Sequence, residues 1–283
     1  MSEPEGLLLV DKPGGITSHD VVDLVRRRLG TRKVGHAGTL DPMATGLLLV
    51  GVGRATRLLR FLSGLPKAYE GTGCLGVETD TLDAEGKVVR TATVAVTRAD
   101  LERAMRGFLG ETEQRPPAYS AVKVGGRVLH RAARAGRSIE APSRVVHIDA
   151  FDLLELQGGD FDFRVSCSSG TYVRVLVADV GTALGCGAHL TRLVRTGVGP
   201  FSLSDARPID DLGTPLPIEA AVRHLPSITL GEDEARAASN GRPLGPAGLE
   251  GPYAVLGPDG SLVAVYRDDV ARAVPEMVLA PPA

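Results

Sequence analysis

The residues that could do chemistry in this sequence gather around one aspartate. Asp41 lies within "VGHAGTLDPMATGLLLVGVG", residues 34–53, in a stretch rich in glycine and threonine that runs into an apolar segment. Glycines let a ligand or another backbone come close, and threonine hydroxyls add hydrogen-bonding groups. We therefore take Asp41 as a candidate catalytic carboxylate, against the simpler interpretation of a turn residue before Pro42.

Other catalytic and cofactor motifs do not occur. "GVGRAT" (51–56) lacks the third glycine of a dinucleotide-binding loop. "DTLDAEG" (80–86) lacks the terminal glutamate of a calcium loop, so we expect a hairpin turn there. The six histidines show no metal-binding spacing, and there is neither a serine-nucleophile elbow nor a Walker motif. We expect no cofactor and no metal.

Length and composition describe a globular intracellular protein. A chain of 283 residues with 43% apolar residues fits one large domain or a large domain with a small one. The net charge is −2, so any surface that binds nucleic acid must be local. Three cysteines without a CxxC pair, and no signal-like start, predict reduced thiols in the cytoplasm. No apolar run is long enough for a membrane span.

Asp41 is expected on a loop between two buried strands. Short apolar runs at 6–10 and 47–53 predict strands that are buried on both faces. The segment 31–46 is too rich in glycine for a helix and predicts an ordered loop. Rigid scaffolds commonly hold functional side chains on loops of this kind.

The rest of the chain alternates between strands and amphipathic helices. Alternating strands with turns at "DAEG" and "QGGD" are expected over 67–89 and 144–168. After residue 226 a β-rich module is expected, with a "GPDG" hairpin. Caps and apolar stripes predict helices over these segments: from Thr17, Ser18 or Asp20 to Gly30, 55–64, 97–110 and 172–184.

The segment 115–144 is strongly basic, with seven cationic residues against one acid, Glu140. The cations are Arg115, Lys123, Arg127, Arg131, Arg134, Arg137 and Arg144. Arg127, Arg131 and Arg134 are spaced for one face of a helix. A solvated helix face is the simpler interpretation, but so many unpaired like charges favour a polyanionic partner.

Five blocks of the sequence resemble the TruB family of tRNA pseudouridine-55 synthases. "KVGHAGTLDPMATGLL" is similar to the catalytic loop of pseudouridine synthases, "LLLVDKPGGITSHDVV" to the N-terminal segment and "KAYEGTGCLGVETDTLDAEG" to the second block. "RPPAYSAVKVGGRVLHRAARAG" resembles the RNA-binding thumb insertion, and "SCSSGTYVRVLVADVGTALGCGAHLTRLVRT" the block that closes the active site. The blocks stand in family order over residues 6–200, and the C-terminal module resembles a PUA domain more weakly.

The resemblance implies a fold, an activity and a partner. The fold would be α+β, a mixed and largely antiparallel sheet with flanking helices, over residues 1–226 with a thumb at about 115–146. A β-rich, PUA-like RNA-binding domain would follow over 227–283. The activity would be isomerisation of uridine 55 in the tRNA T-loop to pseudouridine by base flipping. The implied enzyme is a cytoplasmic monomer that binds tRNA and uses no cofactor.

The resemblance also implies roles for individual residues. Asp41 would be the essential aspartate, paired with Arg174 of "GTYVR". Tyr69 of "KAYEG" would stack on the flipped uracil and handle the proton at C5. The other implied contacts are Tyr172 and Leu193 in the base pocket, His36 against the T-loop bases, and Lys123, Arg127, Arg131 and Arg134 on the RNA backbone. His130 stands where a tyrosine is more usual, which puts one thumb contact in question.

The chemistry is compatible with a single carboxylate. Pseudouridine formation breaks the N1–C1′ bond, rotates the base and joins C5 to C1′, so that nothing is oxidised. Asp41 could attack C1′ or C6, or remove the 2′ proton, and the sequence leaves these routes open. Two other functions also remain open. One is an RNA-binding or tRNA-chaperone protein without catalysis, and the other is a metal-free carbohydrate hydrolase or transferase, which needs a second acid near Asp41.

Overall fold

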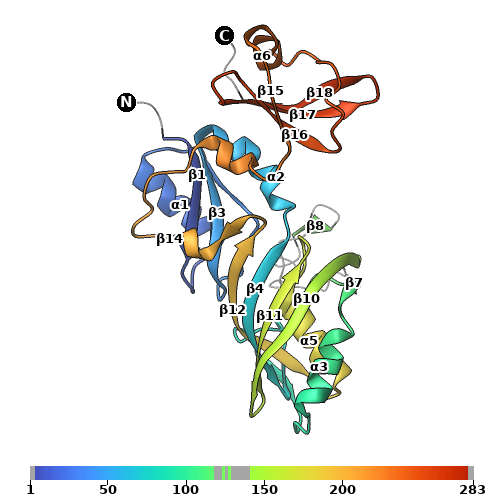
Figure 1. The fold of residues 1–283 in the computed structure, drawn as a ribbon. Helices are drawn as coiled ribbons and strands as arrows, with labels where there is room; N and C mark the ends of the chain where they lie inside the picture. The colour runs from blue at the N-terminus through green and yellow to red at the C-terminus, as the bar shows by residue number, and fades with distance from the viewer. Residues whose placement is uncertain (1–3, 118–122, 125–126, 129–140, 280–283) are drawn as a thin grey trace.

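The computed structural model describes residues 4–117, 123–124, 127–128 and 141–279. Its main element is a ten-stranded sheet in the order β14-β1-β3-β12-β4-β11-β10-β7, with β2 paired to β3 and β13 to β12 (Figure 1). The strands are β1 (Gly6–Lys12), β2 (Val34–Ala37), β3 (Thr45–Val52), β4 (Lys67–Leu75), β7 (Gly110–Gln114), β10 (Arg144–Gln157), β11 (Asp160–Cys167), β12 (Ala188–Val198), β13 (Phe201–Ser202) and β14 (Arg207–Pro208). Only the β1·β14 and β3·β12 pairs of this sheet are parallel among the residues described. The predicted α+β fold with a largely antiparallel sheet is therefore confirmed.

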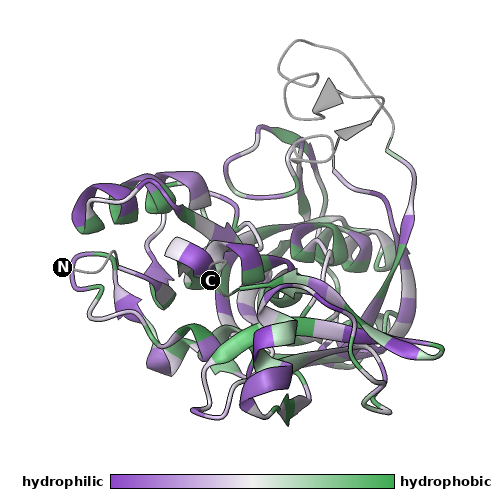
Figure 2. Cartoon of the chain, turned by 90° about the horizontal axis from the view of Figure 1, so that it is seen from above, coloured by the Kyte–Doolittle hydropathy of each residue, from purple (hydrophilic) through white to green (hydrophobic). Residues whose placement is uncertain are grey.

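Helices cover the two ends of the sheet. Helix α1 (Ser18–Leu29) lies against β1 and β3, whereas α3 (Arg98–Arg106) packs against β10 and α5 (Val173–Ala183) against β12 (Figure 1). Thr17 and Asp20 form the capping box of α1, and Gly30 ends it in the left-handed conformation (φ 63°). These ends agree with the prediction. Along the helical ribbons hydrophilic and hydrophobic residues alternate, because one face of each helix packs on the core (Figure 2).

Two predictions near the N-terminal half are corrected. The segment 55–64 is not one α-helix but a 3₁₀-helix η1 (Gly53–Leu58) followed by the short helix α2 (Leu59–Ser63). The predicted loop 31–46 contains strand β2, whose Gly35 pairs with Gly51 of β3. A Cβ on either glycine would lie 3.0 Å from the Leu59 side chain, so both glycines make room for that leucine.

The thumb region is described only in part. Strands β8 (Lys123–Val124) and β9 (Arg127–Val128) form an antiparallel pair. Arg127 therefore lies on a strand, and the prediction that it begins a helical face is wrong at this residue. Arg131, Arg134 and His130 lie outside the described residues.

The C-terminal segment forms a four-stranded sheet in the order β15-β16-β17-β18, at the top of Figure 1. Its elements are β15 (Ser227–Thr229), α6 (Glu232–Ser239), β16 (Pro252–Leu256), β17 (Leu262–Asp269) and β18 (Arg272–Val278). β16 and β17 form the hairpin predicted at "GPDG". This sheet packs on the part of the chain that precedes it through one apolar cluster, which includes Leu62 and Val222 on one side and Val265 and Met277 on the other. Across the described residues, no helix has the length and apolar character of a membrane span.

Candidate active site

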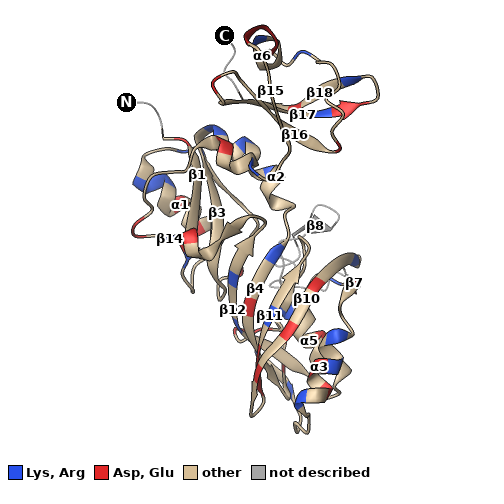
Figure 3. Cartoon of the chain, in the orientation of Figure 1, with Lys and Arg blue, Asp and Glu red and all other residues tan. Residues whose placement is uncertain are grey.

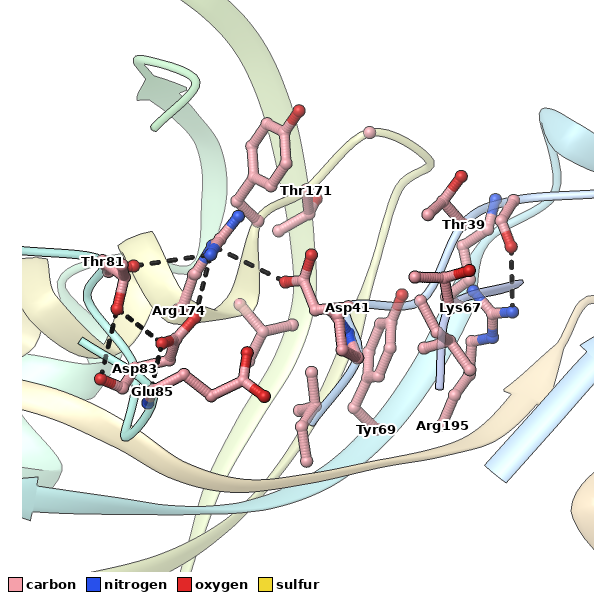
Figure 4. Close-up of a pocket in the computed structure, with 18 of the residues that line it drawn as sticks. Thr39, Asp41, Lys67, Tyr69, Thr81, Asp83, Glu85, Thr171, Arg174 and Arg195 are labelled. Atoms are coloured by element: carbon pink, nitrogen blue, oxygen red, sulfur yellow. Dashed lines mark hydrogen bonds and ion pairs between the residues drawn. The ribbon is translucent and has the colours of Figure 1, made fainter. Parts of the chain in front are cut away.

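A cavity of about 820 Å³ lies between β4, β12, the loop after β2 and the start of α5. Five of the residues predicted for the site line it: Asp41, Tyr69, Tyr172, Arg174 and Leu193. They come from elements that are far apart in the chain, and the sheet brings them together, with Asp41 at the centre (Figure 4). Cavities of this size are typical of small-molecule and cofactor sites.

Arg174 connects Asp41 to a second, deeper aspartate. Its Nε lies 3.6 Å from Oδ2 of Asp41, and its Nη1 donates to Oδ2 of Asp83 at 2.9 Å (Figure 4). The side chains of Arg174 and Asp83 are 5% and 3% exposed, whereas that of Asp41 is 35% exposed toward the cavity. The arginine is thus anchored on its buried side and faces Asp41 on its open side.

Asp83 was missed in the sequence because "DTLDAEG" was interpreted only as a turn. It does lie at a turn, between β5 (Val77–Thr79) and β6 (Val88–Thr91). Its Oδ1 accepts from the Thr81 hydroxyl at 2.5 Å and from the Glu85 N–H at 3.1 Å. Glu85 also lines the cavity. The expectation of a single acid is therefore wrong, but both oxygens of Asp83 are occupied, which fits an anchor and not a proton donor.

Burial and charge act in opposite directions on Asp41. Burial raises the pKa of Asp41 above its usual value, and the nearby Arg174 guanidinium opposes that rise. The negative charge of Asp83 also raises the pKa of Asp41, and the ammonium of Lys12 lowers it. Without Arg174 the carboxylate would be protonated at a higher pH.

Tyr69 lies on β4 directly opposite Arg195 of β12, a buried cation that the sequence did not indicate. Burial raises the pKa of Tyr69, and the Arg195 guanidinium partly opposes this. Arg195 is 1% exposed, and it donates to the carbonyls of Leu47 at 2.7 Å and Gly38 at 3.1 Å. It therefore holds both ends of the Asp41 loop to the wall that carries Tyr69.

The glycines of the loop have a structural reason of their own. Gly46 has φ +98°, and a Cβ there would lie 2.5 Å from the carbonyl oxygen of Arg195. Strands β3 and β12 can therefore come together at this point only around a residue without a side chain. The sequence predicted that a ligand or another backbone would come close to the glycines of this loop, and at Gly46 it is the backbone of β12 that does so.

Two buried lysines fix backbone turns beside the cavity. Lys12 donates to the carbonyls of Pro13 and Ile16 at 2.8 Å and of Pro42 at 3.2 Å, which ties the Asp41 loop to the end of β1. Lys67 donates to two carbonyls at the C-terminal end of α2, those of Ser63 and Leu65. Burial lowers the pKa of each lysine to about 8.

His36 lies on β2, two residues before Gly38, and is not among the residues that line the cavity. Burial lowers the pKa of His36, so the ring is neutral over most of the physiological range. In the part of the chain that the structure describes, no cluster of three or more His, Cys, Asp or Glu side chains could hold a metal ion. All three cysteines are free thiols.

Family models match nearly the whole chain. Residues 26–173 match the "TruB family pseudouridylate synthase (N terminal domain)". Residues 174–216 match the "tRNA pseudouridylate synthase B C-terminal domain", and residues 225–280 the "tRNA Pseudouridine synthase II, C terminal". The chain belongs to the TruB family of pseudouridine synthases. The resemblance found in the sequence is thereby confirmed.

Individual relatives agree with this assignment. tRNA pseudouridine synthase B from Mycobacterium sp. (strain KMS) is 47% identical over 286 residues, which is 98% of this chain and 96% of the relative. The Mycobacteroides abscessus protein of the same name is 45% identical with the same coverage. In solved structures, the chain resembles one in a Cbf5-Nop10-Gar1 complex, with a TM-score of 0.77, 27% identity, and coverage of 98% and 85%. This TruB-family chain is thus a tRNA pseudouridine synthase, an isomerase and not a carbohydrate hydrolase or a catalytically silent RNA-binding protein.

Proposed function

We propose that this enzyme converts uridine 55 in the T-loop of tRNA to pseudouridine, with Asp41 as its essential carboxylate. The observation that carries the proposal is the position of Asp41, which lies 3.6 Å from Arg174 in a cavity with Tyr69, Tyr172 and Leu193 in its walls. The similarity to proteins named tRNA pseudouridine synthase B supports the substrate class.

In this proposal Asp41 acts as an ionised carboxylate in the cavity. Arg174 stabilises the carboxylate and needs no substrate to hold it in place, because Asp83 binds its other side at 2.9 Å. The carboxylate could attack C1′ or C6, or remove the 2′ proton, and each route needs the ionised form. The base that is released has to rotate inside the cavity and rejoin the sugar through C5.

Tyr69 would stack on the detached uracil and handle the proton at C5. Its raised pKa makes it a neutral phenol at rest. To accept the proton from C5, the phenol would first have to give its own proton to water, and Arg195 is the group that would stabilise the phenolate until the C5 proton neutralises it. Tyr172 and Leu193 would complete the base pocket, so that water is excluded while the base is unattached.

The target nucleotide has to leave its stack to reach Asp41. Extrusion of a base costs a few kcal/mol, which stacking on an aromatic ring and contacts to phosphates offset. We assign the phosphate contacts to the thumb cations Lys123, Arg127, Arg131 and Arg134, and a contact with the T-loop bases to His36. The C-terminal sheet would act as a PUA-like RNA-binding domain over 227–283, on a surface other than the first turn of α6, which is acidic (Figure 3). Both domains would work as one monomer, and the three free thiols fit the cytoplasm.

The test is a map of pseudouridine in tRNA from cells with and without the gene. The proposal predicts that deletion removes the modification at uridine 55 and that the intact gene restores it. A T-loop that stays fully modified in a strain without any other source of the activity would contradict the assigned position.

A further inference from the structure

Both ends of the basic insertion are bonded to the loop that precedes Arg174. Strand β7 ends at Gln114 and strand β10 begins at Arg144, and these two residues are register partners in the sheet. The insertion starts after the first residue and returns at the second. Both residues contact the loop at 170–172, directly before α5 begins at Val173.

Gln114 holds the backbone of Tyr172 at two points. Its Oε1 accepts from the Tyr172 N–H at 3.0 Å, and its Nε2 donates to the Tyr172 carbonyl at 3.3 Å. The glutamine is 1% exposed, so water does not compete for these bonds. Tyr172 is the N-cap residue of α5 and its own side chain makes no capping bond. The start of the helix is therefore fixed by a side chain from another strand.

Arg144 holds the same loop and lines the cavity together with it. Its guanidinium lies over the Tyr172 ring, 4.6 Å from the ring centroid, and it also donates to the carbonyl of Gly170. A planar guanidinium can stack and donate at the same time, which a lysine ammonium cannot. The ring of Tyr172 is thereby kept in the wall of the cavity.

These contacts decide where Arg174 lies. Arg174 stands in the first turn of α5, two residues after Tyr172, and its Nε is 3.6 Å from the Asp41 carboxylate. A displacement of about 1 Å at such a group can lower a rate roughly 100-fold. We infer that Gln114 and Arg144 are positioning residues for pseudouridine formation, which set the start of α5 so that Arg174 faces Asp41. This inference rests on the proposed roles of Asp41 and Arg174.

The first test replaces Gln114 with methionine, which keeps the length and the burial of the side chain and removes both hydrogen bonds. We expect the single-turnover rate on tRNA to fall at least about 10-fold, with tRNA affinity changed less than about twofold. Because Arg174 lowers the pKa of Asp41, the acid limb of the rate should also move to higher pH. Gln157→Met, at the exposed end of β10, is the matched control and should leave all three quantities unchanged.

The second test is Arg144→Lys, which keeps the charge and loses the stacked plane. We expect a slower single turnover with an unchanged salt dependence of tRNA binding, because the charge is retained. This variant decides the matter if Gln114→Met does not fold, since Arg144 is only partly buried. Wild-type rates and pH profiles would overturn the inference, as would a loss in Arg144→Lys confined to affinity. An active Asp41→Asn enzyme in the same assay would overturn the proposed function and with it this inference, whereas an inactive Asp41→Asn beside a normal Gln114→Met overturns the inference alone.

Discussion

Arg174 lies 3.6 Å from the Asp41 carboxylate, near enough to favour its ionised form but beyond normal hydrogen-bond length. The same guanidinium makes its short contact, 2.9 Å, with Asp83. The arginine is therefore fixed by the more deeply buried of the two aspartates that line the cavity. The positive charge of Arg174 therefore stabilises the Asp41 carboxylate without a short hydrogen bond between the two side chains.

Asp83→Asn is expected to weaken both the fold and the reaction. Removing the charge of one partner of a buried ion pair leaves the other poorly compensated, which costs about 3 kcal/mol. Denaturant unfolding measures the stability, and single-turnover kinetics should show a slower reaction as Arg174 loses its anchor. Asp211→Asn is the control, because it breaks an exposed pair with Arg207 at 3.4 Å and should change stability by about 0.5 kcal/mol or less. Equal effects from the two variants would contradict this role for Asp83.

The rate is expected to fall as pH rises through about 8, where Lys12 deprotonates. The ammonium serves three carbonyls, one of them that of Pro42 beside Asp41, and a neutral amine has only two N–H groups. Lys67 also titrates near pH 8, but it serves two carbonyls, which the neutral amine can still reach. Lys12→Met should therefore be slow at every pH and lack this limb, while Lys67→Met should keep it.

Unfolding does not account for such a loss of rate. The folded pKa of Lys12 lies below its usual 10.5, so the unfolded chain binds more protons between about pH 8 and 10.5. The contribution of this group to the free energy of unfolding therefore rises with pH across that window. A thermal stability that falls in step with the rate would argue against the explanation from Lys12.

The elements that the sequence predicted are those with signals close together in the chain. The capping box of Thr17 and Asp20, the glycine stop at Gly30 and the hairpin turn at "GPDG" all involve residues a few positions apart. The segment around β2 was not predicted as a strand, because its glycines do not follow an alternating pattern. Gly35 is explained by the room it leaves for the side chain of Leu59, which is distant in the sequence.

Asp41, Tyr69 and Arg174 could be predicted as site residues because each lies in a short sequence motif that resembles a motif of the family. Asp83 and Arg195 could not be predicted, because the role of a buried charged side chain depends on which residues pair with it in the fold. Asp83 meets Arg174 after the β5·β6 hairpin folds back, and Arg195 meets Tyr69 only when β12 pairs with β4. Neither partnership leaves a periodic trace in the sequence.

The C-terminal sheet is expected to stabilise the catalytic domain as well as to bind RNA. Val265 is fully buried in the apolar cluster that the two parts share. Val265→Asp should lower the melting temperature by several degrees, because burying an unpaired carboxylate is strongly unfavourable. Val270→Asp is the control, since Val270 is fully exposed at a turn of the same sheet. A melting temperature that Val265→Asp leaves unchanged would show that the two parts fold independently.

Removal of the thumb charges is expected to weaken tRNA binding and to make the affinity less dependent on salt concentration. Replacing Arg127, Arg131 and Arg134 by glutamine should flatten the slope of log affinity against log salt by about two, at roughly 0.7–0.9 per phosphate contact. The matched control changes three arginines of α3 that already face acids on their own helix: Arg98, Arg103 and Arg106. Identical slopes for the two triple variants would return the basic segment to the interpretation of a solvated surface.

The essential role of Asp41 is the central claim, and Asp41→Asn tests it most directly. The substitution keeps the size and polarity of the side chain and removes the ionised carboxylate. The measurement is tritium release from C5-labelled uridine in tRNA, with tRNA binding measured on the same preparation. The account predicts no detectable release with binding retained, and substantial release by the variant would contradict it.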